Sequence, residues 1–124
     1  MNENNLLLRQ VHPSFIQDGK ITSQVFRPTP KDEAKLSVYD NSKITPENSY
    51  KHFCSQSGFL SYGVMAVSKK ECDSQELPVI EDNEPFPEHC HINFENLSQN
   101  QIEKKAKFLK RFADIRGCLH QAVI

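Results

Sequence analysis

The stretch SQNQIEKKAKFLKRFADIRG, residues 98–117, has the clearest structural pattern in this sequence. Ser98 is a favourable N-cap, and Gln101 three residues later completes a capping box, in which each side chain bonds to the other residue's backbone amide. Apolar side chains then recur at helical spacing along one stripe: Ile102, Ala106, Leu109 and Ala113, widened by Phe108, Phe112 and Ile115. Gly117 is a typical C-terminal stop. The pattern predicts a long amphipathic helix that packs one face on the rest of the protein.

The segments before this helix predict a sheet. Short β-rich or alternating runs indicate strands at 21–26, 36–39, 63–67, 78–82 and 89–94. Two shorter helices are expected, one at 46–56 after the N-cap Thr45 and one at 68–72, where Ser68 begins a second capping box. The apolar run at 6–8 is assigned to no element. This order predicts an α+β fold, a small and mostly antiparallel sheet with the long C-terminal helix and one or two shorter helices packed on it.

The chain has 124 residues, of which 37% are hydrophobic and 25% charged, as is typical of one globular domain. We expect a single domain over residues 1–124, with residues 1–5 frayed. The sequence has no run of about 18 apolar residues, the length needed to cross a membrane. The first ten residues also lack the basic and apolar segments of a signal peptide. The composition therefore predicts a soluble, cytoplasmic protein without a membrane partner.

Four cysteines lie far apart in the sequence, at Cys54, Cys72, Cys90 and Cys118. None belongs to a CxxC pair, which zinc ribbons and zinc fingers use. A chain of this length needs no disulfide to be stable, and an intracellular protein keeps its thiols reduced. We expect four free thiols.

The charges are unevenly distributed although the formal net charge is −1. Residues 71–95 contain eight acidic residues and no Lys or Arg, whereas residues 99–116 contain six basic residues and two acidic ones. One interpretation is that the two stretches neutralise each other across the fold. The other is that the basic helix binds an acidic partner protein or a nucleic acid. Its candidate binding residues are Lys104, Lys107, Lys110 and Arg111.

The stretch PEHCHINF, residues 87–94, places two histidines around a cysteine. Side chains alternate in a strand, so His89 and His91 should share the polar face while Cys90 faces the core. An H-x-H pair on a strand can bind zinc when two further ligands are supplied, and the candidates are His52, Cys54, Cys118 and His120. The interpretation we favour has no cofactor, with both histidines on the exposed sheet face; zinc at His89 and His91 is the alternative.

A second group of polar residues lies near the N-terminus and suits phosphate binding or proton transfer: Arg9, His12, Ser23, Arg27, Lys31, Asp32 and Ser37. The loop that follows Arg27 carries prolines and charges, and loops on rigid scaffolds often carry sites. His12 precedes a proline, which excludes helical backbone there. Histidine titrates near neutral pH, so His12 and His89 are candidates for an acid–base pair.

The sequence contains none of the common catalytic or nucleotide-binding motifs, such as GxGxxG, the P-loop, HExxH or GxSxG. The function we expect is therefore a small protein–protein interaction module, an accessory subunit or an immunity or antitoxin-like protein, with separate acidic and basic surfaces. The alternative is a small enzyme that acts on a nucleotide or RNA through His12 and His89.

Overall fold

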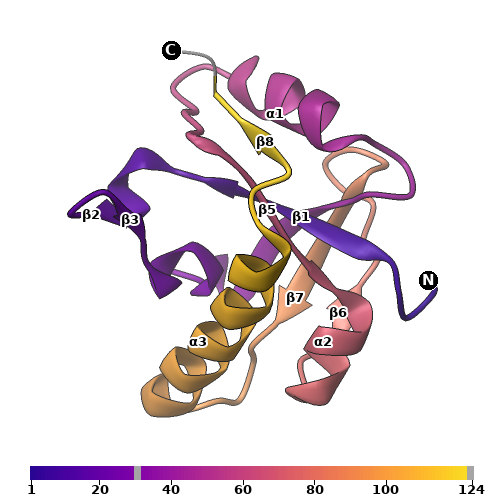
Figure 1. Ribbon diagram of the computed structural model, residues 1–124. Coiled ribbons are helices and arrows are strands. Elements are labelled where there is room, and N and C mark those ends of the chain that lie inside the picture. The colour runs from indigo at the N-terminus through magenta and orange to yellow at the C-terminus, as the bar shows by residue number, and fades with distance from the viewer. Residues whose placement is uncertain (30–31, 123–124) are drawn as a thin grey trace.

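Helix α3, Gln99–Arg116, dominates one side of the computed structural model, which describes residues 1–29 and 32–122 (Figure 1). The predicted capping box is confirmed. The Ser98 hydroxyl accepts a hydrogen bond from the Gln101 amide at 3.2 Å, and the Gln101 side chain accepts one from the Ser98 amide at 2.9 Å. Gly117 ends the helix with a φ of 84°, which only glycine adopts without strain. Ala106, Leu109 and Ala113 are fully buried.

Helix α3 packs on a sheet whose strand order is β6-β7-β4-β1-β5-β8 and whose neighbouring strands are all antiparallel. The predicted α+β fold is therefore confirmed. Within the described residues the elements are β1 Leu6–Val11, η1 Pro13–Phe15, β2 Ile16–Gln17, β3 Lys20–Ile21, η2 Ser23–Phe26, β4 Lys35–Asp40, α1 Pro46–Cys54, β5 Gly63–Ser68, α2 Lys69–Ser74, β6 Val79–Ile80, β7 His89–Asn93, α3 and β8 His120–Gln121.

Strand β1 is central to the sheet, although the sequence analysis assigned its residues to no element. It pairs with β5 along its whole length, from Leu6 opposite Ser68 to Val11 opposite Gly63. Both Leu7 and Leu8 are fully buried, because one faces each side of the sheet. A strand covered on both faces shows no alternation of apolar and polar residues, so its period was not visible in the sequence.

The predicted strand at 21–26 is wrong. Lys20–Ile21 forms a two-residue strand in a small hairpin, and Ser23–Phe26 turns into the 3₁₀ helix η2. Val25 and Phe26 are consecutive and both fully buried. A single-sided strand buries only alternate residues, whereas a 3₁₀ turn can direct both side chains toward the core under α3.

The shorter helices and the other strands lie close to their predicted places. Helix α2 has the predicted capping box between Ser68 and Glu71. Helix α1 ends at Cys54 rather than near 56, and Ser49 is its only fully buried residue in the structure as described. Strand β6 is an edge strand, as predicted, but only two residues long. Strand β8 was not predicted.

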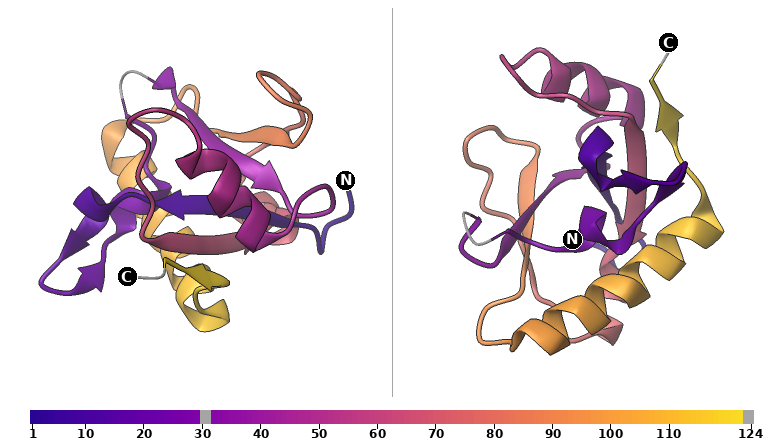
Figure 2. Two further views of the ribbon diagram at one scale, coloured as in Figure 1. Left: turned by 90° about the horizontal axis from the view of Figure 1, so that it is seen from above. Right: turned by 90° about the vertical axis from the view of Figure 1, so that its left-hand side faces the viewer.

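The sheet has a different core on each side. On the α3 side, Leu7, Leu36, Phe94 and Leu109 belong to a large cluster of buried residues. On the α1 side a much smaller cluster is made by Leu8, Tyr39, Val64 and Ala66, with side chains of α1 packed against it. Helices α1 and α3 lie far apart in Figure 1 and in the right view of Figure 2. The fold is thus closed on one face and only partly covered on the other.

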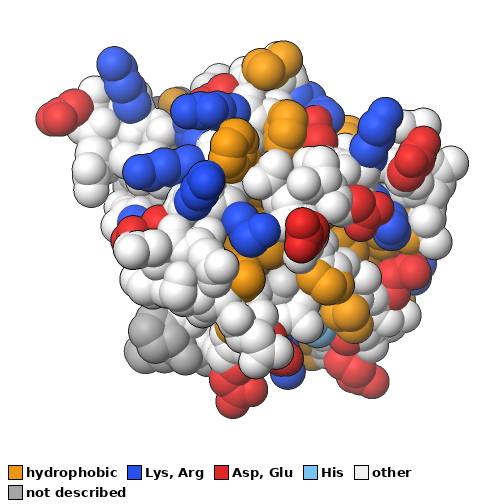
Figure 3. All heavy atoms as spheres, turned by 90° about the horizontal axis from the view of Figure 1, so that it is seen from below, with side chains coloured by type: hydrophobic (Ala, Val, Ile, Leu, Met, Phe, Trp, Pro, Cys, Tyr) orange, Lys and Arg blue, Asp and Glu red, His pale blue; other side chains and the backbone are white. Residues whose placement is uncertain are grey.

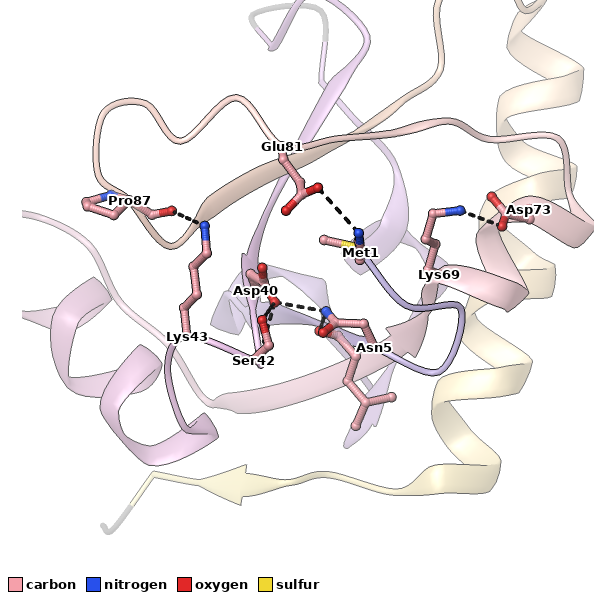
Figure 4. Close-up of polar contacts among 10 residues, drawn as sticks. Met1, Asn5, Asp40, Ser42, Lys43, Lys69, Asp73, Glu81 and Pro87 are labelled. Carbon is pink, nitrogen blue, oxygen red and sulfur yellow. Dashed lines mark hydrogen bonds and ion pairs between the residues drawn. The ribbon is translucent and has the colours of Figure 1, made fainter.

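The first residues of the chain lie against the end of the sheet (Figure 4). The Met1 amino group is 3.8 Å from the Glu81 carboxylate, and the Asn5 side chain donates to Asp40 at 2.9 Å. That residues 1–5 fray in solution, and that the chain is one domain, stay predictions. None of the described helices combines the length and the apolar character needed to cross a membrane.

Candidate functional site

A cleft opens where strands β1 and β4 separate. The two strands pair only through Leu7 with Asp40 and Leu8 with Tyr39, and beyond Leu8 strand β1 stays with β5 alone. The resulting cavity has a volume of about 440 Å³, and its described lining residues are Leu8, Arg9, Gln10, His12, Phe15, Ser37, Val38, Tyr39, Phe53, Gln56, Phe59, Pro85, Phe86 and His89. A concave space of this size, mostly apolar with a few polar groups, is the usual form of a ligand site.

Arg9 bridges the gap between the separated strands. Its Nε donates to the Val25 carbonyl at 2.8 Å, and one terminal nitrogen donates to the Ser37 carbonyl at 3.0 Å. The guanidinium carbon also lies 5.9 Å from the centre of the Phe15 ring. Burial lowers the pKa of Arg9 to about 10, against the opposing influence of Asp32, so the side chain is still charged at neutral pH. No described carboxylate forms an ion pair with it.

Aromatic rings form much of the cleft wall. Tyr39 on β4 stacks on Phe86, with 5.1 Å between ring centres, and its hydroxyl is 2.8 Å from Nδ1 of His52 on α1. Phe86 comes from the loop between β6 and β7, which reaches toward α1 (Figure 2), and it also contacts the ring of His89. Burial, followed by the nearby Cys54 and Glu88, raises the pKa of Tyr39, so the phenol stays neutral. Phe53 and Phe59 also line the cleft, and their ring centres are 5.0 Å apart.

The histidines of β7 do not lie on an exposed polar face, and this prediction is wrong. His91 is only 7% exposed, and both rings bond to one carboxylate, that of Asp82. The distances from Asp82 are 2.6 Å to Nδ1 of His89 and 2.8 Å to Nδ1 of His91. Burial by itself raises the pKa of Asp82, but the two histidine hydrogen bonds, the charge on His89 and a backbone bond from Glu84 outweigh it and lower that pKa. The short β6 strand is what brings Asp82 into place beside β7.

His12 also lines the cleft. Its backbone is extended, with φ −66° and ψ 141°, as the following proline predicts. Its Nδ1 accepts a hydrogen bond from the Ser14 amide at 3.0 Å and lies 2.8 Å from the Ser14 hydroxyl. His12 and His89 therefore line one cavity, which is what an acid–base pair would require; their catalytic role stays a prediction.

The predicted N-terminal group is only partly brought together. Arg9, His12 and Ser37 line the cleft. Arg27 instead pairs with Glu103 on α3 at 3.2 Å, and Asp32 accepts hydrogen bonds from the amide and hydroxyl of Thr29. Ser23 belongs to η2 and does not line the cleft, and Lys31 lies outside the described residues. Ser23, Arg27 and Asp32 thus do not share the cleft with the other three, and phosphate binding by this group stays a prediction.

Sequence reasoning missed the aromatic part of the cleft. Tyr39, Phe53 and Phe86 carry no local signal that separates a cleft wall from an ordinary core. Phe59 is different, because it follows Gly58 and precedes Leu60 in the loop between α1 and β5. Two large apolar residues in a short loop are unusual for solvent-facing backbone. Their exposed fractions are 46% for Phe59 and 58% for Leu60.

The second candidate surface is the outer face of α3. Lys104, Lys107 and Arg111 are exposed, and Arg111 lies 5.3 Å from the ring centre of Phe108. Lys110 forms an ion pair with Asp114 on the next turn, with its Nζ 2.6 Å from a carboxylate oxygen. Figure 3 shows Lys and Arg side chains interleaved with hydrophobic ones on the lower side of the molecule.

The acidic and basic stretches neutralise each other only in part. Glu71 forms a bidentate pair with Arg116 at the end of α3, at 3.0 and 3.1 Å, which leaves the exposed residues of the outer face without a described partner. Glu81 and Asp82 bind elsewhere, to the N-terminus and to the two histidines.

Metal ligands are not clustered in the structure as described. Within residues 1–29 and 32–122, no three His, Cys, Asp or Glu side chains form a group that could hold a metal ion. Of the other ligands considered for zinc, His52 contacts Tyr39, His120 packs on Tyr50, and Cys54 and Cys118 are free thiols. Zinc binding at His89 and His91 stays a prediction. Compared with known proteins, the chain matches no family model, no curated protein and no solved structure.

Proposed function

We propose that this protein is an interaction module, in the manner of an accessory subunit or an antitoxin, that binds an acidic partner protein through the outer face of α3. One observation carries the proposal. Lys104, Lys107 and Arg111 are exposed on this face without an ion pair to any described residue, and they lie beside the half-buried Phe108 and the exposed Ile115. The exposed fraction of Ile115 is 87%.

The mixture of charge and apolar surface favours a protein over a nucleic acid. Protein interfaces are enriched in Arg and aromatic residues and place apolar anchors inside a polar rim. On α3, Phe108 lies one turn after Lys104, and Ile115 lies one turn after Arg111, all on the same side of the helix. Nucleic-acid surfaces are more uniformly basic, whereas the whole chain has a net charge of −1.

The basic residues would act mainly on the rate and selectivity of association. Charge complementarity steers encounter and excludes wrong partners, while desolvated apolar anchors supply most of the affinity. A partner with carboxylates around an apolar pocket fits both requirements. Its binding should weaken as salt concentration rises, because exposed charges are screened over about 10 Å at 0.1 M salt.

The test compares two double charge reversals in tagged protein purified from its own host, with co-purifying proteins quantified by mass spectrometry. Lys107→Glu with Arg111→Glu changes the outer face of α3. Lys20→Glu with Lys35→Glu makes the same change in net charge at exposed lysines on β3 and β4. We expect the α3 variant to lose a specific acidic protein by at least about tenfold, as removal of binding hot spots does, while the matched variant retains it.

The dissociation constant of the identified pair, measured with the purified partner, then decides the matter. An unchanged constant for the α3 variant, or an equal loss in both variants, would contradict the proposal. Circular dichroism of both variants shows whether each is folded.

A second candidate function is turnover of a phosphate-bearing substrate, because His12 and His89 line the same cleft as Arg9. General acid–base catalysis contributes about 10²–10⁴-fold to a rate. Replacement of either histidine by Ala should then abolish any phosphoester hydrolysis measured with nucleotide or RNA substrates. Equal rates for the wild type and both variants would exclude this role.

A further inference from the structure

We infer that the cleft between β1 and β4 binds a small planar ring that carries an anionic group, with the anion at Arg9 and the ring against the aromatic wall. The inference is independent of the α3 surface and of any turnover. It concerns a binding site, and it rests on the charge of the cleft, its ring content and its exposed rim.

The charge of the cleft lining is positive, although the protein as a whole is slightly acidic. Arg9 is the lining side chain that is charged at neutral pH, and the described lining includes no Asp or Glu. Asp82 bonds to His89 from outside the lining, and Asp32 lies near enough to influence Arg9 without forming an ion pair with it. Arg9 is held by two carbonyl oxygens, from Val25 and Ser37, and by no carboxylate. Neutral carbonyls satisfy hydrogens but do not cancel charge, and a largely buried charge is costly unless it is paired.

An anion in the cleft would supply the missing partner. The guanidinium has five N–H donors, and the structure uses Nε and one terminal nitrogen for the two carbonyls. Among the described contacts, donors therefore remain unused on a guanidinium that lines the cavity. Arginine binds phosphate and carboxylate groups in a bidentate manner, and such charge-assisted hydrogen bonds are roughly twice as strong as neutral ones.

The ring part of the ligand follows from the rest of the lining. Four aromatic rings line the cavity in two contacting pairs, Phe86 with Tyr39 and Phe53 with Phe59. Phe59 has 46% of its surface exposed at the rim although it is a large hydrophobic residue. Aromatic rings stack on one another with centres about 4.5–7 Å apart, so a planar ligand ring can cover Phe59 and fill the space beside Phe53.

The size of the cleft limits the ligand. About 440 Å³ is at the lower end of the range for ligand pockets, which suits one ring system with one charged substituent. Gln56 and Ser37 lie in the lining and can bond to polar edges of such a ring. A nucleoside monophosphate and an aromatic carboxylate share this chemistry, and the experiment separates them.

The test is a titration of ¹⁵N-labelled full-length protein followed by amide chemical shifts. The probes are the four nucleoside 5′-monophosphates, benzoate and indole-3-acetate, with adenosine and inorganic phosphate as the halves of one ligand. Each is added to about 10 mM, ten times a Kd of about 1 mM. We expect saturable shifts at cleft residues with at least one ring-bearing anion, and binding at least tenfold weaker for the uncharged nucleoside and for phosphate alone.

Two neighbouring variants test the ring wall without disturbing the core. Phe59→Ala removes an exposed ring that lines the cleft, whereas Leu60→Ala removes an exposed residue that does not line it. Phe59→Ala should weaken binding at least about fivefold, because the ligand ring loses a ring on which it stacks, and Leu60→Ala should leave it unchanged. His12→Ala should weaken binding of the anion more than binding of adenosine.

The outcomes separate the parts of the inference. No cleft shifts with any probe would overturn it entirely. Adenosine binding as tightly as its monophosphate would overturn the role of Arg9 as the anion site. Equal binding by Phe59→Ala and Leu60→Ala would overturn the aromatic wall. A response to benzoate but not to the monophosphates supports the site and identifies the anion as a carboxylate.

Discussion

The two faces of the sheet are built from the same strands but are covered to very different extents. The α3 face carries a continuous core that includes Leu36, Phe94 and Leu109, all essentially without solvent exposure. The α1 face has a small buried cluster around Leu8 and Tyr39, and its remaining apolar side chains are only half-buried. Burial of apolar area drives folding, so the closed face contributes most of the stability.

The incomplete cover of the open face leaves room for the cleft. Helix α1 protects β1 and β5, but the loop that carries Phe86 covers β4 and β7 only from one side. The space between them is the cleft, and its walls are held by hydrogen bonds that Arg9 donates and Asp82 accepts rather than by dense packing. A site on this face can therefore vary without the loss of the fold.

The largest expected effect comes from truncating one residue on each face. Leu109→Ala should lower the free energy of unfolding by about 2–5 kcal/mol, because it leaves a cavity in the closed core. Phe53→Ala on the half-buried face should cost only about 1–2 kcal/mol, since less apolar area is removed from water in the native state. Urea denaturation of both variants gives the two values.

Ile115→Ala is the control for this pair, because it lies on the same helix as Leu109 but outside the core, and it should change stability by less than about 0.5 kcal/mol. If Phe53→Ala cost as much as Leu109→Ala, the faces would not differ in the way described.

The next effect concerns the polar support of the open face. Asp82→Asn should lower the free energy of unfolding at pH 6 by about 1–2 kcal/mol, because a carboxylate bonded to two imidazoles is replaced by a neutral amide. The pKa of Asp82 is depressed in the folded state, so its contribution is fully present above its ordinary pKa of 3.8 and is lost as pH falls through the lower folded value.

Unfolding free energies measured from pH 2.5 to 6 would reveal this contribution. The wild type should lose stability more steeply than Asp82→Asn as the pH falls below about 4. Asp73→Asn is the control, because Asp73 forms an exposed pair with Lys69 that contributes little. Parallel acid limbs for wild type and Asp82→Asn would show that the two histidine bonds do not support the folded state.

The sequence revealed the elements that depend on local signals. Helix α3 was predicted with its bounds because a capping box, a helical stripe and a terminal glycine all lie within 20 residues. Strand β1 was missed because its six residues do not show which strands they pair with or that both faces of the strand are buried. The segment Ser23–Phe26 was misassigned because β-branched and aromatic residues also suit a 3₁₀ turn that faces the core.

The cleft could be predicted only in part, for a similar reason. Arg9, His12, Ser37 and His89 were named from their chemistry, and all four line the cavity. Arg27 and Asp32 were named on the same grounds but bond to Glu103 and Thr29 instead. Side-chain type indicates what a residue can do, whereas the separation of β1 from β4 decides where it can do it, and that separation is a property of long-range pairing.

A smaller effect is expected at the helix caps. Ser98→Ala and Thr45→Ala each remove one hydroxyl that accepts from a backbone amide, of Gln101 at 3.2 Å and of Asn48 at 3.1 Å. Each should cost about 0.5–2 kcal/mol. Hydrogen exchange should distinguish them, because fraying of α1 is local while loss of the first turn of α3 also loosens the closed core. Equal and purely local changes in exchange would contradict this.

The smallest effect changes no stability but compares the same chemical group on the two faces. Cys72 and Cys90 belong to the closed core, and burial, with smaller contributions from nearby carboxylates, raises the pKa of each thiol to about 12. Thiolate is the reactive form, so both should resist an aromatic disulfide reagent at pH 8 until urea unfolds the protein.

Cys118 is exposed and Cys54 half-buried, so these two should react in the native state. Burial also raises the pKa of Cys118, so its rate should increase with pH, and Cys118→Ser should remove that phase. Native reaction of Cys72 or Cys90 at the rate of Cys54, which lies on α1, would mean that the α3 face opens as readily as the face with the cleft.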